Sequence, residues 1–252
     1  MQPRHTKILD ILSRQSSATV AELSRALATS EVTIRKDLSL LEKQGFLQRG
    51  HGFATLQPSD DIANRLAFHY DIKQRIAQAA LESVEDGETV FIESGSCCVL
   101  LAEALASQKR EVTIITNSAF LADYIRKRPE ARVILLGGDY QKESQVMVGP
   151  ILRRCVEDFY VDKLFVGIDG AYAGGVMGNN LARAEAVRAM AEHARKAIVL
   201  TESLKFERPG VVSLFPLDQL YAVYTDDRLG AEARQSLAEK DVKLVTVPVG
   251  EA

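Results

Sequence analysis

Residues 30–54 of this 252-residue chain have the sequence SEVTIRKDLSLLEKQGFLQRGHGFA, and this stretch decides the fold of the N-terminal part. Ile34, Leu38 and Leu41 recur at helical spacing, which predicts a helix with one apolar face. Gly45 ends this helix. The residues after it form two short apolar runs around a Gly-rich tip, and this pattern predicts a β-hairpin.

Two further helices are predicted upstream of this stretch. Apolar residues recur at helical spacing from about residue 5 to residue 14. Thr19 and Glu22 have the spacing of a capping box, so a second helix begins near Val20. Helix, short turn, helix and basic hairpin together indicate a winged helix-turn-helix. In that fold the second helix of the motif enters the major groove and the wing contacts the phosphate backbone.

The outward face of the predicted recognition helix is basic and polar, because its side chains lie opposite the apolar stripe. Such a face, taken alone, equally fits an ordinary solvated helix, and the basic hairpin beside it favours DNA. We expect these residues to contact DNA: Thr19, Ser30, Val32, Thr33, Arg35, Lys36, Ser39, Lys43, Arg49 and His51.

Charge is distributed unevenly along the chain, whose formal net charge is -3. Residues 1–52 hold eight Lys and Arg against five Asp and Glu, a net charge of +3, and the other 200 residues hold 23 against 29, a net charge of -6. Such asymmetry is typical of a nucleic-acid-binding module attached to a larger body. The sequence shows neither an apolar run of the roughly 18 residues that a membrane helix needs nor a signal peptide, so we expect a cytoplasmic protein without a membrane partner.

Cysteine and histidine spacing does not match a zinc site. Cys97 and Cys98 are adjacent, and with the third cysteine of the chain they are expected to be free thiols. Whether this pair has a redox role stays open. The four histidines, His5 among them, are expected on solvated surface. We therefore predict no metal and no cofactor.

A second domain is predicted beyond a polar, Pro-containing stretch. We place a DNA-binding domain at residues 1–56, a linker at 57–71 and an effector domain at 72–252. In the last, β-rich apolar runs alternate with helical patterns. This alternation predicts a Rossmann-like α/β fold, a mostly parallel sheet with helices on both faces.

Polar residues gather where five of these predicted strands end, which is where open α/β sheets bind ligands. Gly95 allows close backbone approach, and the amides of Ser96 and Cys97 at a helix start suit an anion, although any strand-to-helix turn favours Gly and Ser. A carboxylate at Asp169 suits sugar hydroxyls and an ammonium at Lys205 suits phosphate, so the pieces fit a phosphorylated sugar or polyol. The predicted effector-binding residues are Glu93, Ser94, Gly95, Ser96, Cys97, Cys98, Thr116, Asn117, Ser118, Gly137, Gly138, Asp169, Gly170 and Lys205.

Residues 30–54, preceded by VAELSRAL at residues 20–27, resemble the N-terminal domain of the DeoR family of bacterial transcriptional regulators. The strand-end residues resemble, in order, the effector domain of the same family, which is similar in fold to ribose-5-phosphate isomerase. The resemblance implies a repressor of carbohydrate-metabolism genes. Its partners would be double-stranded operator DNA, a phosphorylated sugar or polyol, and further copies of itself in a homo-oligomer, a dimer or a tetramer.

The sequence departs from the family pattern at a few positions. Lys36 stands where many members have a second Arg, and Phe53 where many have a Gly in the wing tip. Glu93 replaces a common Asp, and the Cys97-Cys98 pair replaces two Thr, which removes two hydroxyls that could bind a phosphate or a sugar.

Two other functions compete with a regulator. One is a sugar-phosphate isomerase-like enzyme that carries a DNA-binding head, and the other is a helix-turn-helix scaffold without a small ligand. The isomerases that resemble this fold have a second acid after the DGA segment and a KGGGGA-like loop, whereas here Tyr172 follows Ala171 and no such loop occurs. We therefore predict no enzymatic activity and no catalytic residue. A scaffold would leave the clustered polar strand ends unexplained.

Overall fold

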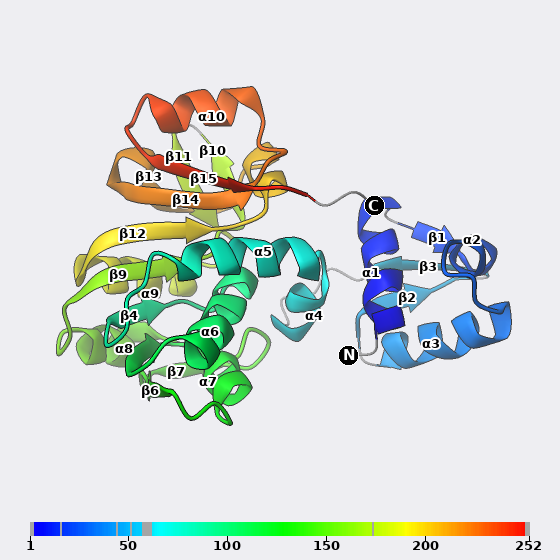
Figure 1. Cartoon of the computed structure of the whole chain (residues 1–252), viewed down its shortest axis with the longest axis horizontal. Helices are drawn as coiled ribbons and strands as arrows, with labels where there is room; N and C mark the ends of the chain where they lie inside the picture. The colour runs from blue at the N-terminus through cyan, green and yellow to red at the C-terminus, as the bar shows by residue number, and fades with distance from the viewer. Residues whose placement is uncertain are drawn as a thin grey trace. The chain divides into compact units, whose positions relative to one another are not determined.

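The computed structural model describes residues 3–15, 17–43, 45–50, 52–56, 62–172 and 174–249. The chain divides into two compact units, Met1–Tyr70 and Asp71–Ala252 (Figure 1). In the described part of the chain, no helix is both long and apolar enough to cross a membrane.

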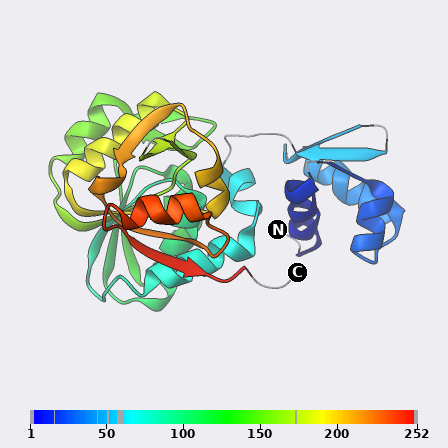
Figure 2. The same cartoon turned by 90° about the horizontal axis from the view of Figure 1, so that it is seen from above.

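The N-terminal unit is a winged helix-turn-helix, as predicted. Its three antiparallel strands pair in the order β1-β3-β2 and lie on one side of the helices (Figure 2). The elements are α1 (Pro3–Gln15), β1 (Ser17–Thr19), α2 (Val20–Ala26), α3 (Glu31–Lys43), β2 (Leu47–Arg49), β3 (Phe53–Leu56) and α4 (Ile62–Ala67).

The predicted apolar stripe of α3 forms the centre of this unit. Ile34, Leu38 and Leu41 are all 0% exposed and pack in one cluster with the apolar residues of α1 and α2. Gly45 has φ +78°, so a glycine suits the turn at which the chain leaves α3.

Helix α4 lies inside the range expected to be linker. Ala67 belongs to the core cluster of the N-terminal unit, and the Asn64 amide donates to the Gly45 carbonyl at 3.1 Å. Residues 62–67 are therefore folded onto that unit, whereas residues 57–61 lie outside the described residues.

The C-terminal unit is built on a sheet whose described strands are all parallel, in the order β15-β14-β12-β9-β4-β5-β6. Helices α5 and α6 lie in front of this sheet in Figure 1 and α8 and α9 behind it. The predicted α/β fold is thus confirmed. The elements are α5 (Tyr70–Leu81), β4 (Thr89–Ile92), α6 (Ser96–Gln108), β5 (Val112–Thr116), α7 (Ala119–Ile125), β6 (Ala131–Leu135), β7 (Asp139–Gln141), β8 (Val146–Val148), α8 (Gly149–Val156), β9 (Val161–Val166), β10 (Gly170–Tyr172), β11 (Gly175–Gly178), α9 (Leu181–Glu192), β12 (Ala194–Leu200), the 3₁₀ helix η1 (Ser203–Glu207), β13 (Val212–Pro216), the 3₁₀ helix η2 (Leu217–Gln219), β14 (Leu220–Asp226), α10 (Ala231–Ala238) and β15 (Lys243–Val247).

Two smaller pieces of antiparallel structure were not expected from the sequence. Strands β7 and β8 form a hairpin, and β10, β11 and β13 form a small second sheet. Both follow the carboxyl end of a strand of the main sheet, so they add walls to the edge at which the predicted ligand site lies.

Candidate DNA-binding face and candidate ligand site

The outward face of α3 gathers five of the residues predicted to bind DNA. Val32, Arg35, Lys36, Ser39 and Lys43 line a shallow depression of about 520 Å³ together with a sixth residue, Leu40. Val32 is 63% and Leu40 44% exposed, so the face combines cations with apolar surface. That mixture suits the major groove, where Lys and Arg contact guanine and apolar groups contact thymine methyls.

The wing strand β2 is held against α3 by Arg49. Its guanidinium donates to the Ser39 hydroxyl, and its backbone N–H donates to the Glu42 carboxylate at 2.9 Å. Arg35 forms an exposed ion pair with Glu31 one helical turn earlier, with an N···O distance of 2.8 Å. These exposed contacts orient the Arg35 and Arg49 side chains. Because exposed ion pairs are weak, breaking them in favour of DNA contacts costs little free energy.

Two of the predicted DNA-contacting residues, Thr19 and Ser30, cap helices. Thr19 Oγ1 accepts from the Glu22 N–H at 3.2 Å, and the Glu22 carboxylate accepts from the Thr19 N–H at 2.7 Å, which confirms the capping box. The Thr19 N–H is the main reason that the pKa of Glu22 lies below its usual value. Ser30 Oγ accepts from the Thr33 N–H at 3.3 Å at the start of α3. Their DNA contacts remain predictions, and His51 lies outside the described residues.

A buried ionic cluster joins α1 to α3. Asp37 is 7% exposed and accepts from Arg4 Nε at 2.5 Å, while His5 Nε2 lies 3.1 Å from its other oxygen. The Arg4 hydrogen bond is the largest cause of the lowered pKa of Asp37. The expectation of a solvated His5 was wrong, because His5 is 4% exposed. The position of Asp37, three residues after Ile34 and one before Leu38, was the sequence signal for burial.

The five strand ends predicted to form the ligand site belong to five consecutive strands of the sheet, β12-β9-β4-β5-β6. Since these strands are parallel, their carboxyl ends meet at one edge of the sheet. The topology therefore brings the predicted residues after β4, β5, β6, β9 and β12 to the same edge.

Glu93 fastens two of these loops together. It is 8% exposed, and its Oε2 accepts from the Gly95 N–H at 2.8 Å and from the Gly167 N–H at 3.1 Å. Its Oε1 accepts from the Ser94 hydroxyl at 2.6 Å. With three protein donors on one carboxylate, Glu93 shapes the loop after β4 and ties it to the end of β9.

At Gly95 the loop after β4 closely approaches the segment after β9. A Cβ on Gly95 would lie 2.9 Å from the Gly167 Cα, so no larger residue fits there without a shift. Helix α6 begins directly after it, and no side chain among the described residues caps this helix at Gly95. Ser96, Cys97 and Cys98 are buried in its first turn. An uncapped first turn at a strand end is where backbone amides can bind an anion.

The segment after β5 contains one unsatisfied buried acceptor. Thr116 Oγ1 accepts from the Ser118 N–H at 3.1 Å, and Ser118 Oγ caps α7. The Asn117 side chain donates to the Met147 carbonyl at 3.1 Å, but its Oδ1 has no hydrogen-bond partner among the described residues, although Asn117 is only 1% exposed. Such an atom points to a bound water or ligand group.

The remaining predicted residues lie in the segments that follow β6, β9 and β12. Asp169 accepts from the Asn179 N–H at 3.0 Å, and the Lys205 N–H donates to the Glu202 carbonyl at 3.1 Å within η1. Gly137 and Gly138 follow β6, and Gly170 begins β10.

Comparison with known proteins assigns both units. The model of the DeoR-like helix-turn-helix domain matches residues 4–59, and the model of the DeoR C terminal sensor domain matches residues 68–227. The chain belongs to the DeoR family. It is a DNA-binding transcriptional regulator, which confirms the resemblance seen in the sequence and does not favour the enzyme alternative.

This DeoR-family chain resembles regulators along nearly its full length. The glycerol-3-phosphate regulon repressor of Escherichia coli (strain K12) is 28% identical, over 96% of this chain and 97% of the relative. The L-fucose operon activator of the same strain is 28% identical, over 89% of this chain and 95% of the relative. Among solved structures, ribose 5-phosphate isomerase A from Methanocaldococcus jannaschii is similar with a TM-score of 0.40 and 19% identity, over 54% of each chain.

Sequence reasoning missed a second buried ionic cluster in the DeoR sensor unit. Lys73 on α5 is 3% exposed, and its Nζ lies 3.5 Å from Glu202 Oε2. Asp226, at the end of β14, accepts from the Ser203 N–H at 2.7 Å and from the Ser203 hydroxyl at 2.8 Å. Asp226, like Asp169, is an acidic residue at the end of a strand, so the sequence pattern could have identified it. The helical pattern around Lys73 has no feature that predicts its burial. No group of three or more His, Cys, Asp and Glu within the described ranges is arranged to hold a metal ion.

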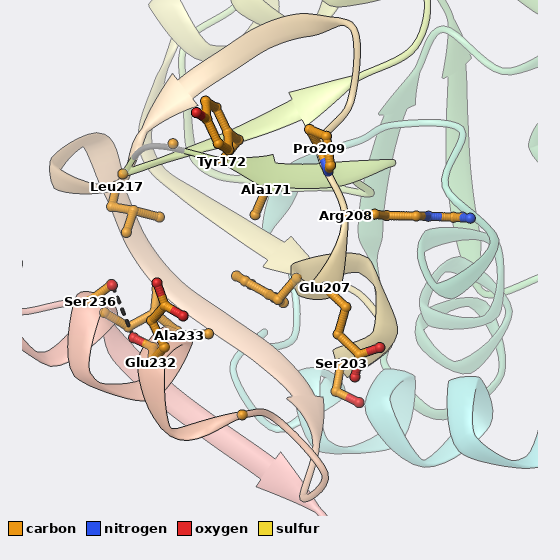
Figure 3. Close-up of a pocket in the computed structure, with 15 residues that line it drawn as sticks. Ala171, Tyr172, Ser203, Glu207, Arg208, Pro209, Leu217, Glu232, Ala233 and Ser236 are labelled. Atoms are coloured by element: carbon orange, nitrogen blue, oxygen red, sulfur yellow. Dashed lines mark hydrogen bonds between the residues drawn. The ribbon is translucent and has the colours of Figure 1, made fainter.

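A cavity of about 590 Å³ lies beside η1 (Figure 3). Ser203 and Glu207 of η1 lie on one side of the cavity, and Ala171 of β10 and Ala233 of α10 lie across from them. Phe206 of η1 also lines the cavity. Apolar groups line much of the interior. Among the described residues, Lys205 lies outside the lining, although its neighbours in η1 belong to it.

Proposed function

We propose that the chain is a repressor of carbohydrate-metabolism genes whose affinity for operator DNA is controlled by a phosphorylated sugar or polyol. The DNA is bound by α3 and the β2–β3 wing. The ligand is bound at the carboxyl ends of β12, β9, β4, β5 and β6. The observation that carries the proposal is the sheet order, which brings the polar ends of these five consecutive strands to one edge.

The DNA half of the proposal rests on the exposed face of α3. Arg35, Lys36 and Lys43 are exposed on the side opposite the buried stripe, and Arg49 of the wing is exposed beside them. Two-fold pairing of such small heads would place operator half-sites one helical turn of DNA apart, about 10 to 10.5 base pairs or a multiple. We accordingly propose a homo-oligomer, a dimer or a tetramer, acting in the cytoplasm, where operator DNA is found.

The ligand half rests on complementary chemistry at one edge. The uncapped start of α6 and the ammonium of Lys205 suit a phosphate, and the carboxylate of Asp169 suits hydroxyl groups. Asn117 Oδ1 adds a buried acceptor that a ligand hydroxyl could satisfy. Relatives named for the glycerol-3-phosphate regulon and the L-fucose operon support a carbohydrate or polyol effector.

Binding at this site should proceed without turnover. Isomerisation of a sugar needs a positioned base and an electrophilic partner. The residue that follows Ala171 is Tyr172, which is 69% exposed and is not an acid. We propose that the site retains recognition and lacks catalysis.

Calorimetry on the full chain tests the ligand half. Glycerol 3-phosphate, ribose 5-phosphate and glucose 6-phosphate are each compared with the unphosphorylated parent. At least one phosphorylated compound should bind, and its parent should bind roughly tenfold or more weakly, since the charge-assisted contacts are lost. Equal affinity of each compound and its parent would remove the phosphate site at α6.

A further inference from the structure

The buried lysine of the sensor unit and its glutamate hold each other in place. The Lys73 side chain is 4% exposed and the Glu202 side chain 12% exposed, with 3.5 Å between Nζ and Oε2. A buried charge is strongly unfavourable when its counter-charge is removed or moves away. The two side chains are therefore constrained to move together.

Glu202 connects this pair to the segment that carries Lys205. It precedes η1 as its N-cap residue, and its carbonyl accepts from the Lys205 N–H at 3.1 Å. The next residue, Ser203, is held by the buried carboxylate of Asp226. Two charged side chains thus contact the start of η1: Asp226 holds Ser203, and Lys73 pairs with Glu202.

The surroundings of η1 leave it room to shift. The cavity of about 590 Å³ borders Ser203, Phe206 and Glu207, so this side of η1 faces open volume (Figure 3). Close-packed interiors resist small displacements because every neighbour must repack. A segment beside a cavity can move without that cost.

Lys73 stands at the start of the sensor unit. Contacts divide the chain between Tyr70 and Asp71, and α5 begins at Tyr70. Lys73 is therefore in the first turn of the helix through which the chain enters the sensor unit. The Lys73–Glu202 pair joins that turn to η1.

We propose that Lys73 and Glu202 are a positioning pair that couples ligand binding at Lys205 to the start of α5, and through it to the DNA-binding unit. The inference rests on the proposed function. An anion held by Lys205 shifts η1 and the Glu202 carboxylate, and the Lys73 ammonium, which lies 3.5 Å from that carboxylate, moves with it. Coupling of this kind requires two arrangements of η1 with different affinities for the anion.

The test uses the full-length double variant Lys73→Met/Glu202→Gln, which removes both charges and leaves neither unpaired. Its matched control is Lys163→Met/Glu88→Gln, a partly buried pair 2.5 Å apart with both side chains 14% exposed. Operator affinity is measured without ligand and with the sugar or polyol phosphate of the calorimetric panel that binds the wild type most tightly. Calorimetry gives the ligand affinity of each variant.

In the double variant the ratio of operator affinities with and without ligand should move toward one by roughly fivefold or more. The control should keep the wild-type ratio, and ligand affinity should stay within about twofold in both. An unchanged ratio in Lys73→Met/Glu202→Gln, an equal loss in the control, or loss of ligand binding itself would overturn the coupling role. If the double variant does not fold, Lys73→Gln/Glu202→Gln, which also removes both charges but keeps polar side chains at both positions, carries the same expectation and the same contrary results. A wild type that shows no ligand effect on operator affinity contradicts the proposed function instead.

Discussion

The two units of this chain place their charged groups in opposite ways. On the DNA-binding unit, Arg35 and Lys36 are exposed on a helix face whose other side is buried. In the sensor unit, Lys73, Glu93 and Asp226 are 3%, 8% and 2% exposed and are all engaged with other groups. Exposed cations suit a long polyanion that is bound and released, whereas buried charges fix loops around a small ligand. Charged residues therefore suit direct contact with DNA in the DNA-binding unit, whereas in the sensor unit they hold loops in position.

The largest effect is expected for the exposed cations of the DNA-binding unit. Arg35→Ala/Lys36→Ala should weaken operator binding by about 2 to 6 kcal/mol, because each residue at a base-reading position contributes about 1 to 3 kcal/mol. The fold should survive, since neither side chain is buried. A gel-shift titration measures the loss, with Lys7→Ala on α1 as the control that keeps affinity. Wild-type affinity in the double variant would remove the recognition-helix assignment.

Asp37 is the exception in the DNA-binding unit, since it is a buried charge there. Asp37→Asn should lower the local stability of α1 and α3 by about 2 kcal/mol, because Arg4 loses a charged hydrogen-bond partner while its own side chain, 37% exposed, stays solvated. The lowered pKa of Asp37 means that its contribution is present above the usual carboxyl range and is lost as pH falls through the folded-state value. Hydrogen exchange of α1 and α3 amides in the full chain measures both effects. Asp86→Asn, at an exposed ion pair, is the control, and equal protection in the two variants would contradict the buried role of Asp37.

Substitution of Lys205 tests whether the sensor unit, like the DNA-binding unit, has a cation that contacts its ligand directly. Lys205→Gln should weaken binding of the phosphorylated ligand by about 1.5 to 3 kcal/mol, the range for a hydrogen bond to a charged group. Operator affinity without ligand should be unchanged. Calorimetry provides the measurement and Lys240→Gln, exposed after α10, the control. Full ligand affinity in Lys205→Gln would place the phosphate elsewhere on the strand-end edge.

The smallest effect is expected at a helix cap. Thr19→Ala should cost about 1 kcal/mol of local stability in α2, the usual loss when an N-cap side chain is removed. Exchange of the α2 amides reports it, and Ser17→Ala on the exposed side of β1 is the matched change. If operator affinity falls while α2 keeps its protection, Thr19 acts through DNA contact and not through capping.

Local patterns were sufficient to predict the winged helix-turn-helix and the strands of the main sheet, but not helix α4, the β7–β8 hairpin or the β10-β11-β13 sheet. The stripe of Ile34, Leu38 and Leu41 and the capping box at Thr19 were confirmed because both depend on residues within two helical turns. Strand-end residues were identifiable because parallel strands end at one edge. Long-range burial was not predictable: His5 and Lys73 are buried only because α1 packs on α3 and α5 lies against the end of β12. The ligand-contact roles of the predicted strand-end residues remain predictions.

The central claim is that a phosphorylated sugar or polyol controls DNA binding by this chain. Operator affinity of the full-length protein, measured by footprinting while glycerol 3-phosphate, ribose 5-phosphate or glucose 6-phosphate is titrated, tests that claim most directly. We predict a change of roughly tenfold or more with at least one of these compounds and none with its unphosphorylated parent. An operator affinity that stays constant with every phosphorylated compound, or that changes equally with the parent compounds, would contradict the account.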